Sequence, residues 1–216
     1  MIRIRLTHTK IGALRYTGNL DMQKVWERTF RRARLPLTYS QGFHTQPRIN
    51  QACPLPLGFG SDVELLDFWL NEPLPLEEIR SSIEDALPGG VSIHKIEVVD
   101  LHAPALQTQV DTSEYEIILH QEVNHAELET KVAEILSATS LPRERRGKMY
   151  DLRPLITSMR IIDGADQSLI LHLTTTVREG ATGRPEEVLL ALGLDPFRTT
   201  ITRTQLHLKP SQPIIS

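Results

Sequence analysis

The sequence predicts an α+β protein in which the order strand, helix, strand, strand, helix, strand occurs twice. Apolar residues alternate in short segments and recur at helical spacing in others, and Pro, Gly and Asn separate these segments. The second half of the chain repeats the element order of the first. These observations indicate two tandem ferredoxin-like (βαββαβ) halves with antiparallel sheets. The halves are expected at residues 1–100 and 112–210, with a linker over residues 101–111.

The first half begins with an alternating segment. Apolar Ile2, Ile4 and Leu6 alternate with polar residues, which predicts a strand with one solvated face. Asn19 or Asp21 can cap a helix over residues 20–34, whose apolar residues recur at helical spacing. The other elements expected in this half are strands at 37–39, 63–70 and 91–98 and a helix at 75–87.

The second half shows the same succession without sequence identity. Its strands are expected at residues 115–119, 155–162, 169–177 and 200–208, and its helices at 126–138 and 185–194. Apolar helix residues should face the sheets. They are Ile79 and Ile83 in the first half and Leu128, Val132 and Ile135 in the second.

Composition restricts the class of protein. The 216 residues carry a formal charge of -3, which argues against general nucleic-acid binding but permits a local basic patch. Aromatic residues make up 5%, so the cores should depend on Leu, Ile, Val and Ala. Cys53 is the only cysteine, which is typical of a reduced, cytoplasmic protein. No apolar run approaches the roughly 20 residues of a membrane span, and residues 1–6 lack a signal peptide's apolar block.

Residues 39–48, Tyr-Ser-Gln-Gly-Phe-His-Thr-Gln-Pro-Arg, form the most distinctive segment. Hydrogen-bonding side chains are concentrated there beside turn-forming Gly42 and Pro47, a pattern that suits ligand contact better than core packing. Ser40, Gln41 and His44 are therefore candidate binding residues. We expect Phe43 to face inward, because an exposed Phe would lose about 1.5–3 kcal/mol of burial.

Arginines surround this segment. Arg31 and Arg32 lie in the last turn of the first helix, where the helix dipole alone can account for cations. The functional alternative is an edge that binds phosphates together with Arg15 and Arg48. In that interpretation the four arginines converge on one groove.

The histidines leave two interpretations open. His44 can be a hydrogen-bonding strut in the turn, or a ligand contact or general acid–base. Paired with His8, it would suit an RNA endonuclease. The remaining histidines lack metal-ligand spacing, so neither a metal nor a cofactor is predicted.

A basic run, Arg143-Glu-Arg-Arg-Gly-Lys148, precedes Asp151-Leu-Arg153 in the second half. Arg146 and Arg153 are candidate contacts to RNA phosphates. The alternatives are an exposed basic loop for the run and a structural ion pair or strand-end brace for Asp151 and Arg153.

Several motifs together resemble a bacterial family of radical SAM-linked proteins. They are Lys10-Ile-Gly-Ala-Leu-Arg15, Asn19-Leu-Asp21, Glu27-Arg-Thr-Phe-Arg-Arg-Ala33, Ser40-Gln-Gly-Phe-His44, Pro47-Arg-Ile49, Pro54-Leu-Pro-Leu-Gly58 and Asp151-Leu-Arg-Pro-Leu-Ile156. The resemblance implies that a separate radical SAM protein is a partner. Where family members often read Phe-His-Pro-His-Pro, this chain reads Phe43-His-Thr-Gln-Pro47. The chain has no cysteine cluster, so it is not itself the radical SAM enzyme.

Three functions are compatible with these observations. The first is a non-catalytic accessory protein that contacts RNA or a ribonucleoprotein and acts with a radical SAM enzyme. The second is an RNA-processing endonuclease that uses His44 and His8. The third is a structural module that only pairs with another protein.

Overall fold

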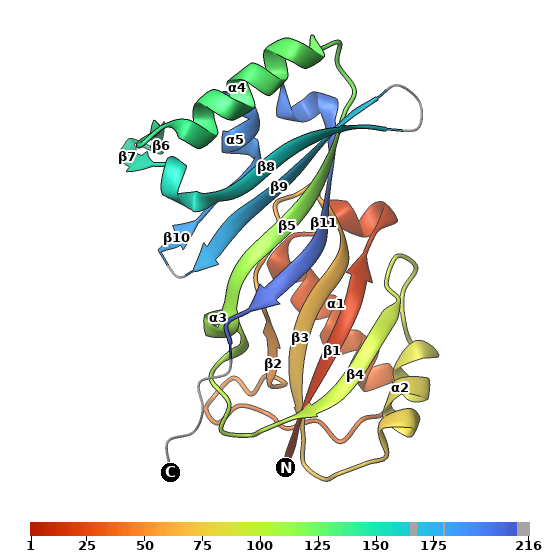
Figure 1. Ribbon diagram of the computed structural model, residues 1–216. Helices are drawn as coiled ribbons and strands as arrows, with labels where there is room; N and C mark the ends of the chain where they lie inside the picture. The colour runs from red at the N-terminus through yellow and green to blue at the C-terminus, as the bar shows by residue number, and fades with distance from the viewer. Residues whose placement is uncertain (165–167, 179, 211–216) are drawn as a thin grey trace. The chain divides into compact units, whose positions relative to one another are not determined.

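The computed structural model describes residues 1–164, 168–178 and 180–210. The chain divides after Val110 into two compact units, each a mixed α+β arrangement (Figure 1). The linker was expected over residues 101–111, and all of these residues except Asp111 lie within the first unit. Among the described residues, no helix is long and apolar enough to cross a membrane.

The first unit contains a four-stranded antiparallel sheet. Its elements are β1 (Ile2–Lys10), α1 (Asn19–Arg32), β2 (Ile49–Gln51), β3 (Gly60–Leu70), α2 (Leu76–Glu84) and β4 (Ile93–Val99), with short helices η1 (Gly12–Tyr16) and α3 (Leu106–Gln109). β1 pairs with β3 and β4, and β2 pairs with β3, which gives the order β4–β1–β3–β2.

The second strand of this unit differs from the prediction. Residues 37–39 form only isolated bridges, Leu37 with Leu70 and Tyr39 with Pro47, and the strand itself is β2. Pro36 and Pro47 have no backbone N–H to donate, so a regular ladder cannot run through them.

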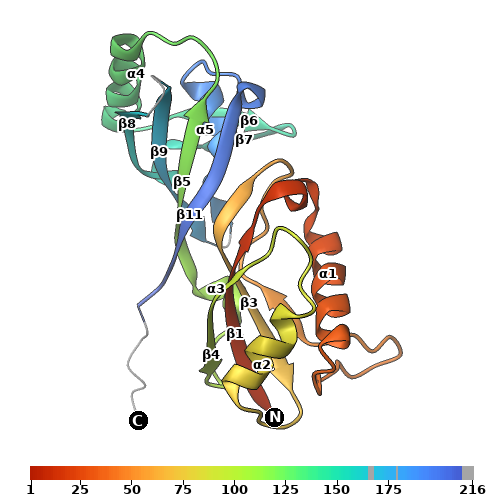
Figure 2. The same ribbon diagram turned by 90° about the vertical axis from the view of Figure 1, so that its right-hand side faces the viewer.

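The core of the first unit lies between its sheet and two helices. Residues of α1 and α2, including Trp26, Phe30 and Ile83, pack against the strand residues Ile4 and Phe68. Figure 2 shows both helices along one face of the sheet. Ile79 and Ile83 are fully buried, as predicted.

The opposite face of this sheet is not solvated at its centre, contrary to the prediction for the first strand. Arg3 and Arg5 are buried and share the buried carboxylate of Asp67, at 2.6 and 2.7 Å. The Arg3 guanidinium also donates to the carbonyl oxygens of Ala103 and Pro104. The alternation was identified correctly, but the sequence pattern could not show that residues 101–110 cover the arginine face.

The second unit also has paired strands and helices. Its elements are β5 (Val110–Leu119), α4 (His125–Ser137), β6 (Pro142–Arg145), β7 (Lys148–Asp151), β8 (Ile156–Asp163), β9 (Leu169–Arg178), β10 (Ala181–Thr182), α5 (Pro185–Ala191) and β11 (Thr199–Leu208), with 3-10 turns η2 (Arg153–Leu155) and η3 (Pro196–Arg198). β9 pairs antiparallel with β5, β8 and β10, and β11 lies beside β5.

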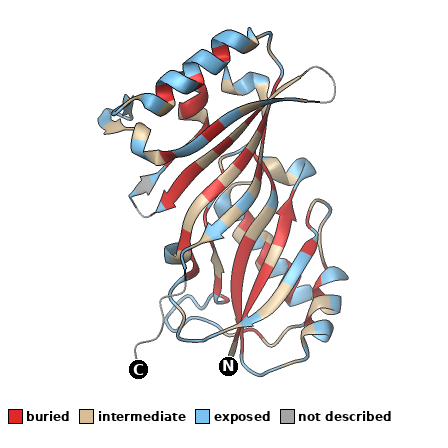
Figure 3. Cartoon of the chain, viewed as in Figure 1, coloured by how far each residue is buried: buried red, intermediate tan, exposed pale blue. Residues whose placement is uncertain are grey.

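Burial in the second unit alternates along β5. Along β5, Ser113, Tyr115, Ile117 and Leu119 are buried and their neighbours are more exposed (Figure 3). The helix residues Leu128, Val132 and Ile135 are buried, as predicted. The β6–β7 hairpin forms a separate two-stranded sheet.

Candidate nucleic-acid interface

Residues 38–48, the hairpin loop, are held by a short set of hydrogen bonds. The Arg48 N–H donates to the Thr38 carbonyl oxygen and the Ser40 N–H to that of Gln46, both at 2.8 Å. The Gln46 N–H donates to the Ser40 hydroxyl at 3.0 Å. Ser40 therefore helps to close the hairpin, and the narrow tip consists of residues 41–45.

The tip is exposed throughout. Phe43 has a relative exposure of 106%, so the prediction that its ring faces inward is wrong. Pro47 is the buried residue that anchors this segment, and the tip is too short to cover a large ring. Gln41 and His44 are exposed beside Phe43.

The His44 imidazole makes no hydrogen bond to any residue in the described part of the chain. A strut would hold a buried polar group, and this ring lies in solvent instead. The geometry therefore leaves His44 available for contact with a ligand.

The solvent face of α1 is basic. Met22, Trp26, Thr29 and Phe30 are its buried side. Lys24, Arg28, Arg31 and Arg32 recur at i, i+4, i+7 and i+8 and are all exposed, so they lie on the opposite side. Together with Arg34, they form what we call the basic face of α1. Lys24 lies 3.4 Å from Asp21, and the four arginines have no ion pair within the described residues.

Arg34 has an unusual backbone conformation. Its φ of 55° lies in the left-handed region, just after the end of α1. This position normally takes Gly or Asn, because a side chain there costs about 1–2 kcal/mol. A cation is therefore retained at the end of the basic face despite a conformational cost.

Arg48 does not join these arginines. Its guanidinium carbon lies 4.6 Å from the centroid of the Trp69 ring, and that of Arg3 lies 5.1 Å from the same ring. Trp69 is two residues from Asp67 in β3, so both project from the sheet face opposite α1. Arg48 therefore lies on that face, while Arg31 and Arg32 belong to the helix layer.

Arg15 is also separate from the others. Its Nε donates to the Gly58 carbonyl oxygen at 2.9 Å, near the end of β1 where Lys10 pairs with Ser61. Arg48 lies near the start of β1, with its guanidinium 3.6 Å from the Met1 sulfur. At about 3.3 Å per strand residue, roughly 30 Å separate Met1 from Lys10. The predicted convergence of Arg15, Arg31, Arg32 and Arg48 on one groove is therefore wrong.

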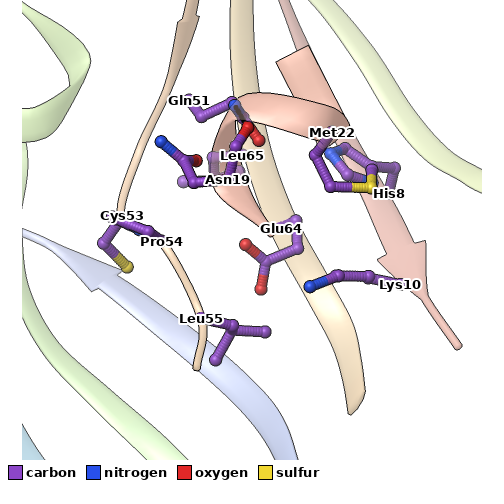
Figure 4. Close-up of a pocket in the computed structure, with 10 residues that line it drawn as sticks. All are labelled: His8, Lys10, Asn19, Met22, Gln51, Cys53, Pro54, Leu55, Glu64 and Leu65. Atoms are coloured by element: carbon purple, nitrogen blue, oxygen red, sulfur yellow. Dashed lines mark hydrogen bonds between the residues drawn. The ribbon is translucent and has the colours of Figure 1, made fainter. Parts of the chain in front are cut away.

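A small polar pocket lies beneath the start of α1 (Figure 4). Its volume of about 10 Å³ is enough for about one water molecule. His8, Lys10, Cys53 and Glu64 contribute polar groups, and the Glu64 carboxylate and the Lys10 amino group point toward each other. A pocket of this size does not admit a nucleotide.

His8 is buried in this pocket. Its Nδ1–H donates to the Thr9 carbonyl oxygen at 2.9 Å, and its ring meets Trp26 edge-on at 4.7 Å between centroids. Burial lowers the pKa of His8 below its usual value, and the hydrogen bond to Thr9 and the charge of Glu64 oppose this shift. The imidazole is therefore held neutral in the folded protein.

The lowered pKa of His8 predicts that stability falls on acidification. Below about pH 6.5 the unfolded chain binds a proton at this imidazole that the folded protein does not, so stability should fall by about 1 kcal/mol or less toward pH 5.5. Urea unfolding of the wild type and of His8→Gln across this range measures the difference. His44→Ala should keep the wild-type dependence. If His8→Gln also keeps the wild-type pH dependence, buried His8 is not the cause of the lower stability in acid.

The two histidines of the endonuclease hypothesis are not brought together. His8 lies on β1 under α1, whereas His44 lies at the exposed tip of the hairpin loop, whose base adjoins the other end of β1. The described residues contain no group of three or more His, Cys, Asp or Glu side chains that could hold a metal ion.

In the second unit, Arg146 and Arg153 have different surroundings. Arg146 is exposed in the β6–β7 turn, with a φ of 52° before Gly147 at 73°. The Arg153 guanidinium donates to the carbonyl oxygens of Leu136 and Ile156, at 2.7 and 2.9 Å. Arg153 thus braces α4 against the start of β8.

Asp151 accepts two backbone hydrogen bonds, from the N–H groups of Leu141 and Arg153 at 2.7 and 3.0 Å. The bond from Leu141 is the main cause that lowers the pKa of Asp151. Of the alternatives considered for Asp151 and Arg153, the contacts match the strand-end brace.

The sequence did not indicate Trp69 as a residue of interest, although its ring contacts both Arg3 and Arg48. Residues that are neighbours across a sheet leave no local motif in the sequence.

The two units define a mixed α+β protein that carries an exposed polar hairpin and a basic helix face. The chain belongs to the family described as "Uncharacterized protein conserved in bacteria (DUF2344)", whose sequence profile matches residues 3–185. Comparison with curated proteins gives no match.

Several solved structures align with most of this chain. A chain of a Cbf5–Nop10–Gar1 complex aligns with a TM-score of 0.52 and 9% identity over 94% of this chain and 48% of the other. For an archaeal box H/ACA sRNP Nop10–Cbf5 complex the TM-score is 0.48, with 10% identity over 94% and 47%. The acetolactate synthase small subunit from Thermotoga maritima aligns with a TM-score of 0.28 and 13% identity over 98% and 99%.

This chain spans about half the length of the first two solved chains. At 9% identity, the likeness to the Cbf5–Nop10–Gar1 chain concerns the fold alone.

Proposed function

We propose that this protein is a non-catalytic accessory protein that binds RNA, alone or within a ribonucleoprotein, through the basic face of α1 and the tip of the hairpin loop. One observation carries the proposal. Arg28, Arg31 and Arg32 in α1 and Arg34 just beyond its end are exposed, and none of them has an acidic partner within the described residues.

Local structure does not account for this set of cations. A helix dipole stabilises cations only in the last turn, which includes Arg31 and Arg32 but not Lys24. Arg34 lies beyond the helix, in a conformation that disfavours a side chain. In a chain with a formal charge of -3, a local cluster of this kind suits the closely spaced phosphates of a nucleic acid.

The other candidate residues take different parts in the proposal. Gln41 and His44 are available for contact at the hairpin tip, while Ser40 closes the hairpin. Arg146, also exposed with a left-handed backbone, is proposed as a second phosphate contact in its own unit. Arg15, Arg48 and Arg153 are engaged by Gly58, Trp69 and backbone carbonyl groups, so the proposed interface does not include them.

Three further parts of the proposal extend beyond the site. The family resemblance supports a separate radical SAM enzyme as a partner. The strand order β4–β1–β3–β2 supports a ferredoxin-like first half, and the order β11–β5–β9–β8 supports a ferredoxin-like second half. The single cysteine supports a cytoplasmic location.

The test is RNA binding by Arg31→Ala/Arg32→Ala, measured by fluorescence anisotropy at several salt concentrations. Each neutralised phosphate contributes about 0.7 to the slope of log K against log salt for single strands, so losing two contacts should lower that slope by about 1.4. Affinity should fall most at low salt. Both arginines are exposed, so the melting temperature should change little.

Lys95→Ala/Arg160→Ala is the matched control. It removes the same charge from two exposed positions outside the basic face and should keep wild-type binding and salt dependence. Equal losses in the two double variants would show that only net charge matters. A wild-type protein that binds no RNA would contradict the proposed function itself.

A further inference from the structure

We propose that the hairpin loop selects single-stranded RNA by stacking an unpaired base on Phe43. This inference rests on the proposed function and deepens it by naming the class of RNA. Phe43 is the most exposed large apolar residue of the described chain, at 106%, and it lies at the tip of the hairpin loop, whose base at Thr38 closely follows Arg34 of the basic face in sequence.

The surroundings of Phe43 favour a base over a protein surface. Gln41, Gly42, His44 and Thr45 are all exposed, so within the tip the Phe43 ring is a single apolar group among polar ones. The other exposed ring of the hairpin loop, Tyr39 at 42%, lies below the tip, where it bridges to Pro47. A protein interface normally centres on a contiguous apolar patch, which the tip does not provide. An isolated ring bordered by amide and imidazole groups suits a nucleobase, which has an apolar face and polar edges.

The hairpin also gives the ring a fixed support. Backbone hydrogen bonds between its two sides and the buried Pro47 restrict the loop below the tip. Stacking on a partly preorganised ring costs less conformational entropy than stacking on a free loop.

The hairpin loop lies close enough to the basic face along the chain for one RNA strand to make both phosphate contacts and a stacking contact. Arg34 of the basic face and Thr38 at the hairpin base are four residues apart, which is at most about 14 Å of chain. One RNA strand could therefore place phosphates on α1 and a neighbouring base on Phe43. In a duplex the bases are already paired and stacked, so Phe43 would have no base face to contact.

The test measures the affinity for two RNAs by fluorescence anisotropy. One is a single-stranded 12-nucleotide oligoadenylate, and the other is the duplex that this strand forms with oligouridylate. The wild type should prefer the single strand. Phe43→Ala should weaken single-strand binding by about fivefold to 150-fold and leave duplex binding unchanged. Phe43→Trp should retain the preference, because it keeps a stacking surface. Phe197→Ala, at a ring that is 96% exposed in the second unit, should behave as the wild type.

The outcomes separate this inference from the proposed function. If Phe43→Ala keeps single-strand affinity while Arg31→Ala/Arg32→Ala loses it, the stacking role is wrong and RNA binding stands. Equal wild-type affinity for the two RNAs would also overturn it. Loss of a co-purifying protein from Phe43→Ala, with RNA binding unchanged, would assign the ring to a protein interface. No binding of either RNA by the wild type would remove both proposals.

Discussion

Asp67→Asn should destabilise the protein by about 3–5 kcal/mol, since it leaves buried arginines without their carboxylate. Asp67 is fully buried and receives hydrogen bonds from the guanidinium groups of Arg3 and Arg5, at 2.6 to 3.0 Å. Asparagine keeps the shape of the side chain but removes its charge. Two buried guanidinium groups would then face each other with no anion between them.

The measurement is the free energy of unfolding in urea, with Asp62→Asn as the control. Asp62 is an exposed residue of the same strand, so the same substitution there should change stability by less than about 0.5 kcal/mol. A loss below about 1 kcal/mol for Asp67→Asn would mean that the remaining acceptors suffice for the arginines. These acceptors are the carbonyl groups of Ala103 and Pro104 for Arg3 and the Gln109 side chain for Arg5.

The ion-pair cluster shows what the sequence could predict and what it could not. Alternation along β1 correctly indicated a strand and assigned Ile4 and Leu6 to the core. The same pattern implied that Arg3 and Arg5 face solvent. Their burial depends on Asp67 and on residues 101–110, which are distant in sequence, and hydrophobic periodicity reports only local structure.

The hairpin loop shows a similar limit. Its composition correctly identified an exposed polar turn, and the structure leaves His44 free in solvent there. The direction of Phe43 was predicted from its hydrophobicity, but a short turn held by Ser40 and Pro47 has no room to bury it. The convergence of four arginines also failed, because neighbouring positions in sequence can project from opposite faces of a sheet, as Arg48 and Ile49 do.

Low aromatic content led to another expectation that the structure modifies. The chain is 5% aromatic, which suggested aliphatic cores. In the first unit, however, Trp26, Phe30 and Phe68 form a continuous row between α1 and β3. Composition gives the number of rings but not their location, and three of the few present are concentrated at this one contact.

Phe30→Ala should therefore destabilise the protein by about 3–5 kcal/mol through lost burial and the cavity left behind. Phe30 is fully buried, and its ring centroid lies 4.4 Å from that of Phe68 and 5.3 Å from that of Trp26. The ring joins α1 to the sheet, so its removal loosens the helix that carries the basic face. Thermal and urea unfolding measure the loss.

Phe197→Ala and Phe43→Ala are the controls for this prediction, because both rings are almost completely exposed. Each should change stability by less than about 0.5 kcal/mol. Under conditions where Phe30→Ala remains folded, its RNA affinity should match that of the wild type, since the ring does not reach the surface. A stable Phe30→Ala protein that has lost RNA binding would instead mean that the orientation of α1, rather than the charge of its exposed face, determines binding.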